Sequence, residues 1–154
     1  MNTERPPSAA SSADTERPPE PRAPFVLALL PDPRNQRGFE PSYLVHLVNL
    51  GATRVERVVR DTGGFASCDD ELIVATGRPT ELGALEPEKA LLVSKEGPGS
   101  FDFTVWWELE LELAGGERTR LGFGVPGNFP VCRHDAVWRH VPALGAEAWV
   151  LAPE

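Results

Sequence analysis

The chain has 154 residues, 41% of them hydrophobic, and a formal net charge of −8. This length allows one domain with a single core, and the hydrophobic content excludes wholesale disorder. The negative charge argues against nucleic-acid binding by phosphate neutralisation and against adhesion to an anionic membrane surface. We therefore expect neither nucleic acid nor membrane as a partner.

The N-terminus shows no basic stretch followed by an apolar run. No apolar segment approaches the roughly 18 residues that span a bilayer. These features predict a cytoplasmic protein. The two cysteines, Cys68 and Cys132, are then expected to be reduced thiols.

Residues 1–23 are rich in proline, serine, alanine and charge, and they contain no apolar residue after Met1 that could anchor them. Such a segment cannot bury enough surface to offset its conformational entropy, so we expect a disordered tail over 1–23 and one domain over 24–154. The five residues Thr3–Pro7 recur as Thr15–Pro19. This duplicated five-residue segment is either a tandem docking motif in polyproline II conformation or a solvated spacer.

From Pro24 onward, short apolar runs alternate with turn residues at a spacing of about 8 to 12 positions, which is typical of an antiparallel sandwich or barrel. The first five runs are Phe25–Leu30, Tyr43–Asn49, Val55–Asp61, Leu72–Ala75 and Ala90–Ser94. The third run is expected to stop at Gly63 and Gly64. The pattern predicts an all-β fold, an antiparallel immunoglobulin-like β-sandwich.

The clearest segment is Phe101–Leu113, in which every odd position is apolar. This alternation predicts a long strand with one buried and one exposed face. Arg118–Val125 also places apolar residues at odd positions, so the two segments predict a hairpin whose loop is Ala114-Gly115-Gly116. The predicted pairs are Glu112 with Arg118 and Glu110 with Arg120 on the exposed face, and Leu109 with Leu121, Trp107 with Phe123 and Val105 with Val125 on the buried face.

The same register sets Trp106 opposite Gly124, on the otherwise polar face. An indole over a cross-strand glycine stabilises a sheet. Trp106 is alternatively an exposed anchor for a partner, since tryptophan is enriched among binding hot spots. A third alternative is that the chain after Val125 folds back and covers it.

The C-terminal stretch 126–154 is less regular. Its segment Asp135–Trp138 is compatible with a short helical turn or with a strand. Trp149–Leu151 predicts a last short strand or docking segment.

Two turn motifs resemble those of the immunoglobulin-like bacterial β-sandwiches of the CARDB or DUF11 kind. Asn49-Leu50-Gly51 ends one strand and precedes the next, and Leu85-Glu86-Pro87 forms a corner before a later strand. The resemblance covers residues 24–125. It implies the fold and a habit of binding, and it transfers no functional residue.

Candidates for chemistry are few. Cys132, His134 and His140, joined by Cys68 or His46, would supply zinc ligands or a cysteine nucleophile with a histidine base. Standard zinc spacings are absent, and scattered histidines with a buried thiol explain the same residues. We expect no cofactor.

The row Glu108, Glu110 and Glu112 resembles a pair of catalytic carboxylates, but a solvated strand face with arginine partners explains it equally.

The sequence thus predicts a non-catalytic protein-binding or assembly module, an accessory subunit of a bacterial complex, whose partner is another protein or a second copy. Trp106 and Trp138 are its candidate binding residues. Two alternatives remain open. One is a small metal- or cysteine-dependent hydrolase that uses Cys132, His134 and His140, and the other is a sandwich that binds a carbohydrate or another small ligand through Trp106 or Trp138.

Overall fold

A computed structural model describes residues 24–34, 42–61, 63–68, 71–76, 79–97, 104–125, 127, 129 and 136–154, with the backbone alone for 63–68 and 71–76. The predicted tail, 1–23, lies outside these residues. The described elements are all β-strands, which confirms the predicted all-β class. Within this part of the chain, no helix has the length and apolar character needed to cross a membrane.

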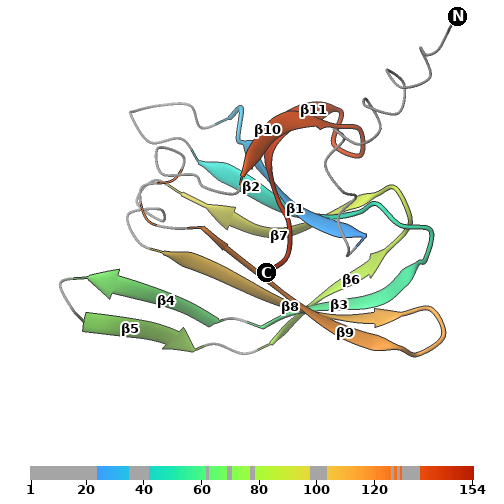
Figure 1. Cartoon of the computed structure of the whole chain (residues 1–154), viewed down its shortest axis with the longest axis horizontal. Coiled ribbons are helices and arrows are strands. Elements are labelled where there is room, and N and C mark those ends of the chain that lie inside the picture. Colours follow the sequence, from blue (N-terminus) through green and yellow to red (C-terminus); the bar gives the residue numbers. More distant parts are fainter. Residues whose placement is uncertain are drawn as a thin grey trace, which may run out of the picture.

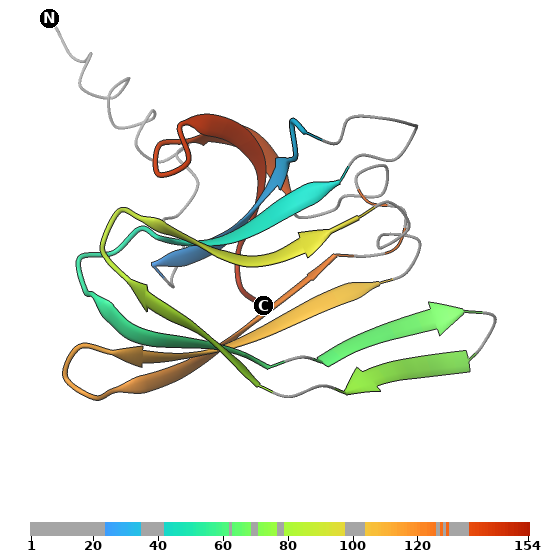
Figure 2. The same ribbon diagram turned by 180° about the vertical axis from the view of Figure 1, so that it is seen from behind.

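The strands form two antiparallel sheets and a separate two-stranded pair (Figures 1 and 2). Sheet A has the order β10-β11-β1-β2-β7, sheet B has the order β6-β3-β8-β9, and β4 pairs with β5. The strands are β1 Phe25–Pro31, β2 Tyr43–Asn49, β3 Val55–Asp61, β4 Gly63–Cys68, β5 Glu71–Thr76, β6 Thr80–Leu85, β7 Ala90–Glu96, β8 Val105–Leu113, β9 Arg118–Val125, β10 Val137–Val141 and β11 Ala146–Leu151.

The main core lies between sheets A and B, which makes the fold a β-sandwich. Its buried members come from both sheets because alternate residues of each strand point to the same face. Sheet A contributes Phe25, Leu27, Leu29, Tyr43, Val45, Leu47, Val93 and Leu151, and sheet B contributes Val55, Val58, Leu85, Trp107, Leu109, Leu111, Leu121, Phe123 and Val125.

β1 is buried on both faces, as its unbroken apolar run indicates. Phe25, Leu27 and Leu29 belong to the main core, whereas Val26 and Ala28 join a second cluster on the other face of sheet A. That cluster also includes Ala148 and Val150 of β11. The β10–β11 hairpin curls at the top of the molecule in Figure 1, on the side of sheet A away from sheet B.

The predicted β8–β9 hairpin is confirmed in register and loop. Glu112 faces Arg118, Trp107 faces Phe123 and Trp106 faces Gly124. The loop Ala114–Gly116 uses positive φ at both of its glycines, where glycine avoids the steric cost of a side chain. The long alternating strand is described from Val105, and Phe101–Phe103 lie outside the described residues.

The side chain of Asn49 is completely buried where the two sheets meet. Its Nδ2 donates to the carbonyl oxygens of Thr53 at 2.9 Å and Leu85 at 3.5 Å, and its Oδ1 accepts from the amide of Gly51 at 2.9 Å. Its backbone N–H donates to Lys89 O at 3.0 Å. One residue therefore joins the end of β2, the start of the β3 segment and the turn between β6 and β7.

Gly51, the last residue of the Asn-x-Gly motif, packs against the start of β1. A Cβ at Gly51 would lie 2.7 Å from Cβ of Pro24, and the intervening Leu50 N–H donates to Pro24 O at 2.7 Å. The motif therefore requires glycine because the chain entering β1 occupies the space of a side chain.

Two further hydrogen bonds join sheet B to β7 of sheet A. The Trp107 Nε1–H donates to Ser94 Oγ at 3.1 Å, and the Ser94 hydroxyl donates to Glu96 Oε2 at 2.8 Å. Arg60 of β3 donates to the carbonyl oxygen of Val93 in β7. These bonds satisfy polar groups at the sandwich interior that would otherwise be costly to bury.

The structure corrects several expected boundaries. Strand β4 begins at Gly63, where the third apolar run was expected to end. No strand was predicted over the residues of β6. Both are short segments of low β-propensity that exist because a partner strand pairs with them. The ambiguous segment near Trp138 is a strand from Val137 onward, and Asp135 lies outside the described residues.

We predict that Asn49→Ala lowers the free energy of unfolding by about 3 kcal/mol, because it leaves several buried backbone groups without a hydrogen-bond partner. Urea denaturation monitored by tryptophan fluorescence measures the change. Leu50→Ala is the matched control, since Leu50 is exposed and its loss should cost no more than about 0.5 kcal/mol. Equal losses in the two variants would contradict the role given to Asn49.

Candidate functional site

The two candidate tryptophans lie on different sheets. Trp106 is on β8 of sheet B, and Trp138 is on β10 of sheet A. They therefore do not form one site. Trp106 is partly buried, whereas Trp138 has an exposed fraction of 43%.

The candidate metal ligands are only partly placed. Cys132 and His134 lie outside the described residues, as does the side chain of Cys68. His46 is on β2 and exposed His140 is on β10, and β1 and β11 separate these strands. Among the described residues, no three or more His, Cys, Asp or Glu side chains lie together so that they could hold a metal ion.

The indole of Trp106 lies flat against two glycines of β9. A Cβ built on Gly122 would lie 2.5 Å from Cζ2 of Trp106, and one built on Gly124 would lie 2.6 Å from Cε3. Both glycines are thus required for the indole to reach the strand. The sequence pointed to Gly124 and missed Gly122, which lies on the same face two positions earlier.

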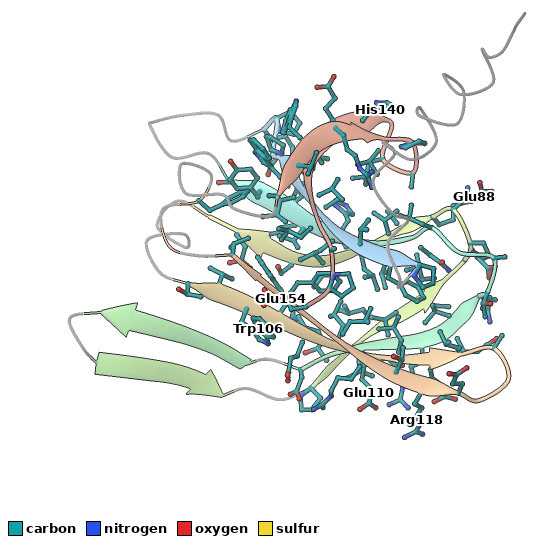
Figure 3. All side chains as sticks on the ribbon, viewed as in Figure 1. Glu88, Trp106, Glu110, Arg118, His140 and Glu154 are labelled. Atoms are coloured by element: carbon teal, nitrogen blue, oxygen red, sulfur yellow. The ribbon has the colours of Figure 1, made fainter. Side chains whose placement is uncertain are left out.

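The end of the chain also lies over this part of β9. The Glu154 N–H donates to the carbonyl oxygen of Gly122 at 2.9 Å, and Oε2 of Glu154 would be 3.1 Å from a Cβ on Gly124. Figure 3 shows Glu154 next to Trp106. The chain after Val125 does return to this face, so packing accounts for Trp106 without a partner.

The exposed Trp138 is held in one orientation. Its Nε1–H donates to Oε2 of Glu147 at 2.7 Å, and its ring meets the ring of Trp149 edge to face, with centroids 5.1 Å apart. Its neighbour Val137 has an exposed fraction of 58%. A large ring that is already ordered loses little side-chain entropy on binding, which suits it to act as an anchor.

An aromatic row leads from this surface into the core. Trp138 contacts Trp149, Trp149 contacts Phe129 at 5.9 Å, and Phe129 contacts Tyr43 at 5.7 Å between ring centroids. Burial raises the pKa of the Tyr43 phenol. Because each ring packs against the next, the position of Trp138 depends on the main core.

The row of glutamates on β8 lies on the outer face of sheet B, among arginines. Arg118 lies 3.6 Å from Glu112, and Arg120 lies 3.9 Å from Glu110 and 3.3 Å from Asp61. Figure 3 places Glu110 and Arg118 together on this face. Exposed pairs of this kind are worth at most about 1 kcal/mol each, so they mainly favour one register of the hairpin.

The position of Trp138 on an edge strand was not foreseen from the sequence. β10 lies at one edge of sheet A, and its first four residues are exposed. Only the aromatic residues of the C-terminal stretch indicated this region. Glu147, which orients the indole, carried no recognisable signal because a single carboxylate is common on any strand.

Comparison of the chain with protein-family models, with curated proteins and with solved structures gave no match.

We predict that Gly122→Ala lowers the free energy of unfolding by about 2 kcal/mol, because the added methyl group overlaps the indole of Trp106. Thermal and urea unfolding measure the loss. Gly97→Ala is the control, since a methyl group added there would meet no atom of the described residues within 4 Å and Gly97 is not among the glycines with positive φ. The loss should shrink in a Trp106→Ala background, and an unchanged loss there would refute the overlap.

A second prediction concerns His46, whose Nδ1 is buried without a hydrogen-bond partner among the described residues. Burial lowers the pKa of His46, and the backbone of Leu44 partly opposes this. As pH falls from about 7 to 5, the unfolded state binds a proton more readily than the folded state, so the free energy of unfolding decreases. His46→Leu should flatten this part of the pH profile, measured by urea denaturation.

His46→Leu should keep the decrease that carboxylates cause at lower pH, as in the parent protein. A parent profile that His46→Leu leaves unchanged would contradict the prediction.

Proposed function

We propose that this protein is a non-catalytic protein-binding or assembly module whose docking surface is the β10 edge. We define the β10 edge as strand β10 with Glu147 and Trp149 of β11. The observation that carries the proposal is the exposure of Val137 and Trp138 on an edge strand, with the Trp138 ring already fixed by Glu147 and Trp149.

Two physical features of this edge suit protein recognition. An edge strand offers unpaired backbone N–H and C=O groups that an added strand can use. Tryptophan at the centre of an interface contributes more binding free energy than most residues, especially in a site that excludes water. The edge thus combines a backbone template with one large anchor.

The proposal extends to the wider setting of the molecule. The Asn49–Gly51 and Leu85–Pro87 motifs meet where the buried Asn49 side chain donates to the carbonyl oxygen of buried Leu85, which supports the resemblance to immunoglobulin-like bacterial sandwiches of the CARDB or DUF11 kind. We propose an accessory subunit of a bacterial, cytoplasmic assembly.

A carbohydrate-binding sandwich is the second candidate. Its support is the same oriented indole beside a carboxylate, because an exposed aromatic face stacks on apolar faces of ligands and a neighbouring acid accepts hydrogen bonds. Saccharide binding that Trp138→Ala abolishes would favour this candidate over the protein-binding module.

We predict that Trp138→Ala weakens binding of the physiological protein partner at least tenfold, which corresponds to about 1.4 kcal/mol. The partner is captured from the source organism with the parent protein, identified, purified and titrated calorimetrically. Leu50→Ala is the control, because Leu50 is similarly exposed but lies away from β10, on the loop after β2. Equal affinities for the two variants would overturn the proposed surface, and a chain that binds no protein, itself included, would overturn the function.

A further inference from the structure

One face of the β10–β11 hairpin carries two indoles, an imidazole and a carboxylate. The register sets Trp138 opposite Trp149 and His140 opposite Glu147, and residues that face each other across an antiparallel pair share a side of the sheet. The two indole planes are inclined at 61°, with their centroids 5.1 Å apart. Trp138, His140 and Glu147 are exposed, so a ligand can reach this face.

The N–H groups of both indoles are bonded within the chain. Trp138 Nε1–H donates to Oε2 of Glu147 at 2.7 Å. Trp149 shares a side-chain hydrogen bond with Tyr43, and an indole nitrogen can only donate. A ligand on this face therefore meets the ring faces and a carboxylate, which are all electron-rich and attract positive charge.

The carboxylate of Glu147 has no cation of its own in the part of the chain that the structure describes. Every glutamate on the strands of sheet B forms an ion pair with an arginine, namely Glu56, Glu81, Glu108, Glu110 and Glu112. No such pair involves Glu147. Arg139 of β10 faces Ala148, which belongs to the second cluster, so Arg139 lies on the opposite face of the hairpin.

We infer that Trp138, Trp149 and Glu147 bind an arginine side chain of the partner protein. This inference rests on the proposed function and names the chemistry of the partner at the same surface. A guanidinium group stacks its plane on the face of an indole, and its N–H groups donate to a neighbouring carboxylate. The exposed fraction of 43% leaves part of Trp138 available for this contact.

Two features favour arginine over a neutral ligand or a lysine. The carboxylate at the Nε1–H edge of Trp138 polarises the indole, so that its ring face becomes more negative and attracts a cation more strongly. A lysine ammonium is compact and strongly hydrated, and it cannot stack as a plane does. The net charge of −8 also favours encounter with a basic partner.

A peptide titration of the full chain tests the inference. The probe is a capped pentapeptide with one arginine between glycine and serine residues. A matched peptide carries citrulline, which has nearly the shape of arginine but no charge. NMR of the indole N–H signals detects weak binding, and the Trp138 signal is assigned by its loss in Trp138→Leu. The arginine peptide should shift this signal saturably, and the citrulline peptide should bind at least about fivefold more weakly.

Two variants separate the carboxylate from the net charge of the chain. Glu147→Gln should weaken binding of the arginine peptide at least about fivefold, because it removes the charge next to the guanidinium. Glu117→Gln is the matched control, since it removes the same charge from an exposed residue in the turn between β8 and β9. Its affinity should stay within about twofold of the parent chain.

Trp138→Leu keeps an apolar side chain but removes the ring face, so it should also weaken binding at least about fivefold, read from the Trp149 signal. Equal binding of the arginine and citrulline peptides would overturn the inference, as would equal affinities of Glu147→Gln and Glu117→Gln. A neutral saccharide that binds more tightly than the arginine peptide would overturn it in favour of the second candidate function. A Trp138 signal that shifts with the concentration of the chain alone would identify a second copy as the occupant and overturn the separate partner.

The fate of the proposed function is read separately, from the captured protein partner. A partner that is lost on Trp138→Ala but binds Glu147→Gln as tightly as the parent chain would overturn this inference and leave the proposed function standing. A chain that binds the arginine peptide but no protein would overturn the proposed function and leave Trp138, Trp149 and Glu147 as a cation site.

Discussion

The buried amide of Asn49 is the interaction on which the arrangement of the two sheets depends. A buried amide is costly unless each of its polar atoms finds a partner. Asn49 finds its partners in Thr53, Leu85 and Gly51, which belong to segments that lead into or out of both sheets. The geometry that satisfies one side chain therefore also sets the relative position of β2, β3 and β6. The Asn-x-Gly motif is thus explained by hydrogen bonding and by close packing against Pro24.

Sheet A extends from this corner to its edge strand β10. There the aromatic row from Tyr43 reaches the surface at Trp138. At the other side, the end of the chain crosses to β9 beside Trp106. One tryptophan is therefore used in packing and the other is displayed. The sequence does not distinguish Trp106 from Trp138, because the exposure of each indole depends on which strands lie beside it.

The candidate site was only partly predictable. Trp138 stands out from the sequence as a large apolar side chain near the C-terminus, but its strand has four exposed residues and no alternation to reveal it. The contribution of Glu147 depends on pairing with β10, which places it beside the indole nine residues away. Of the three residues of the hypothesised Cys132, His134 and His140 site, the structure describes only His140, which is exposed on β10. The other two lie outside the described residues.

By itself, the sequence determined the all-β class, the bounds of β2, β3 and β9, and the register of the β8–β9 hairpin. These features follow from local alternation and from a glycine-containing loop, so neighbouring residues are enough to specify them. Tertiary structure alone decided the existence of β4 and β6, the hydrogen bond from Glu154 to β9 and the exposure of β10. Each of these depends on segments far apart in the chain, and no local pattern records which strand will lie beside which.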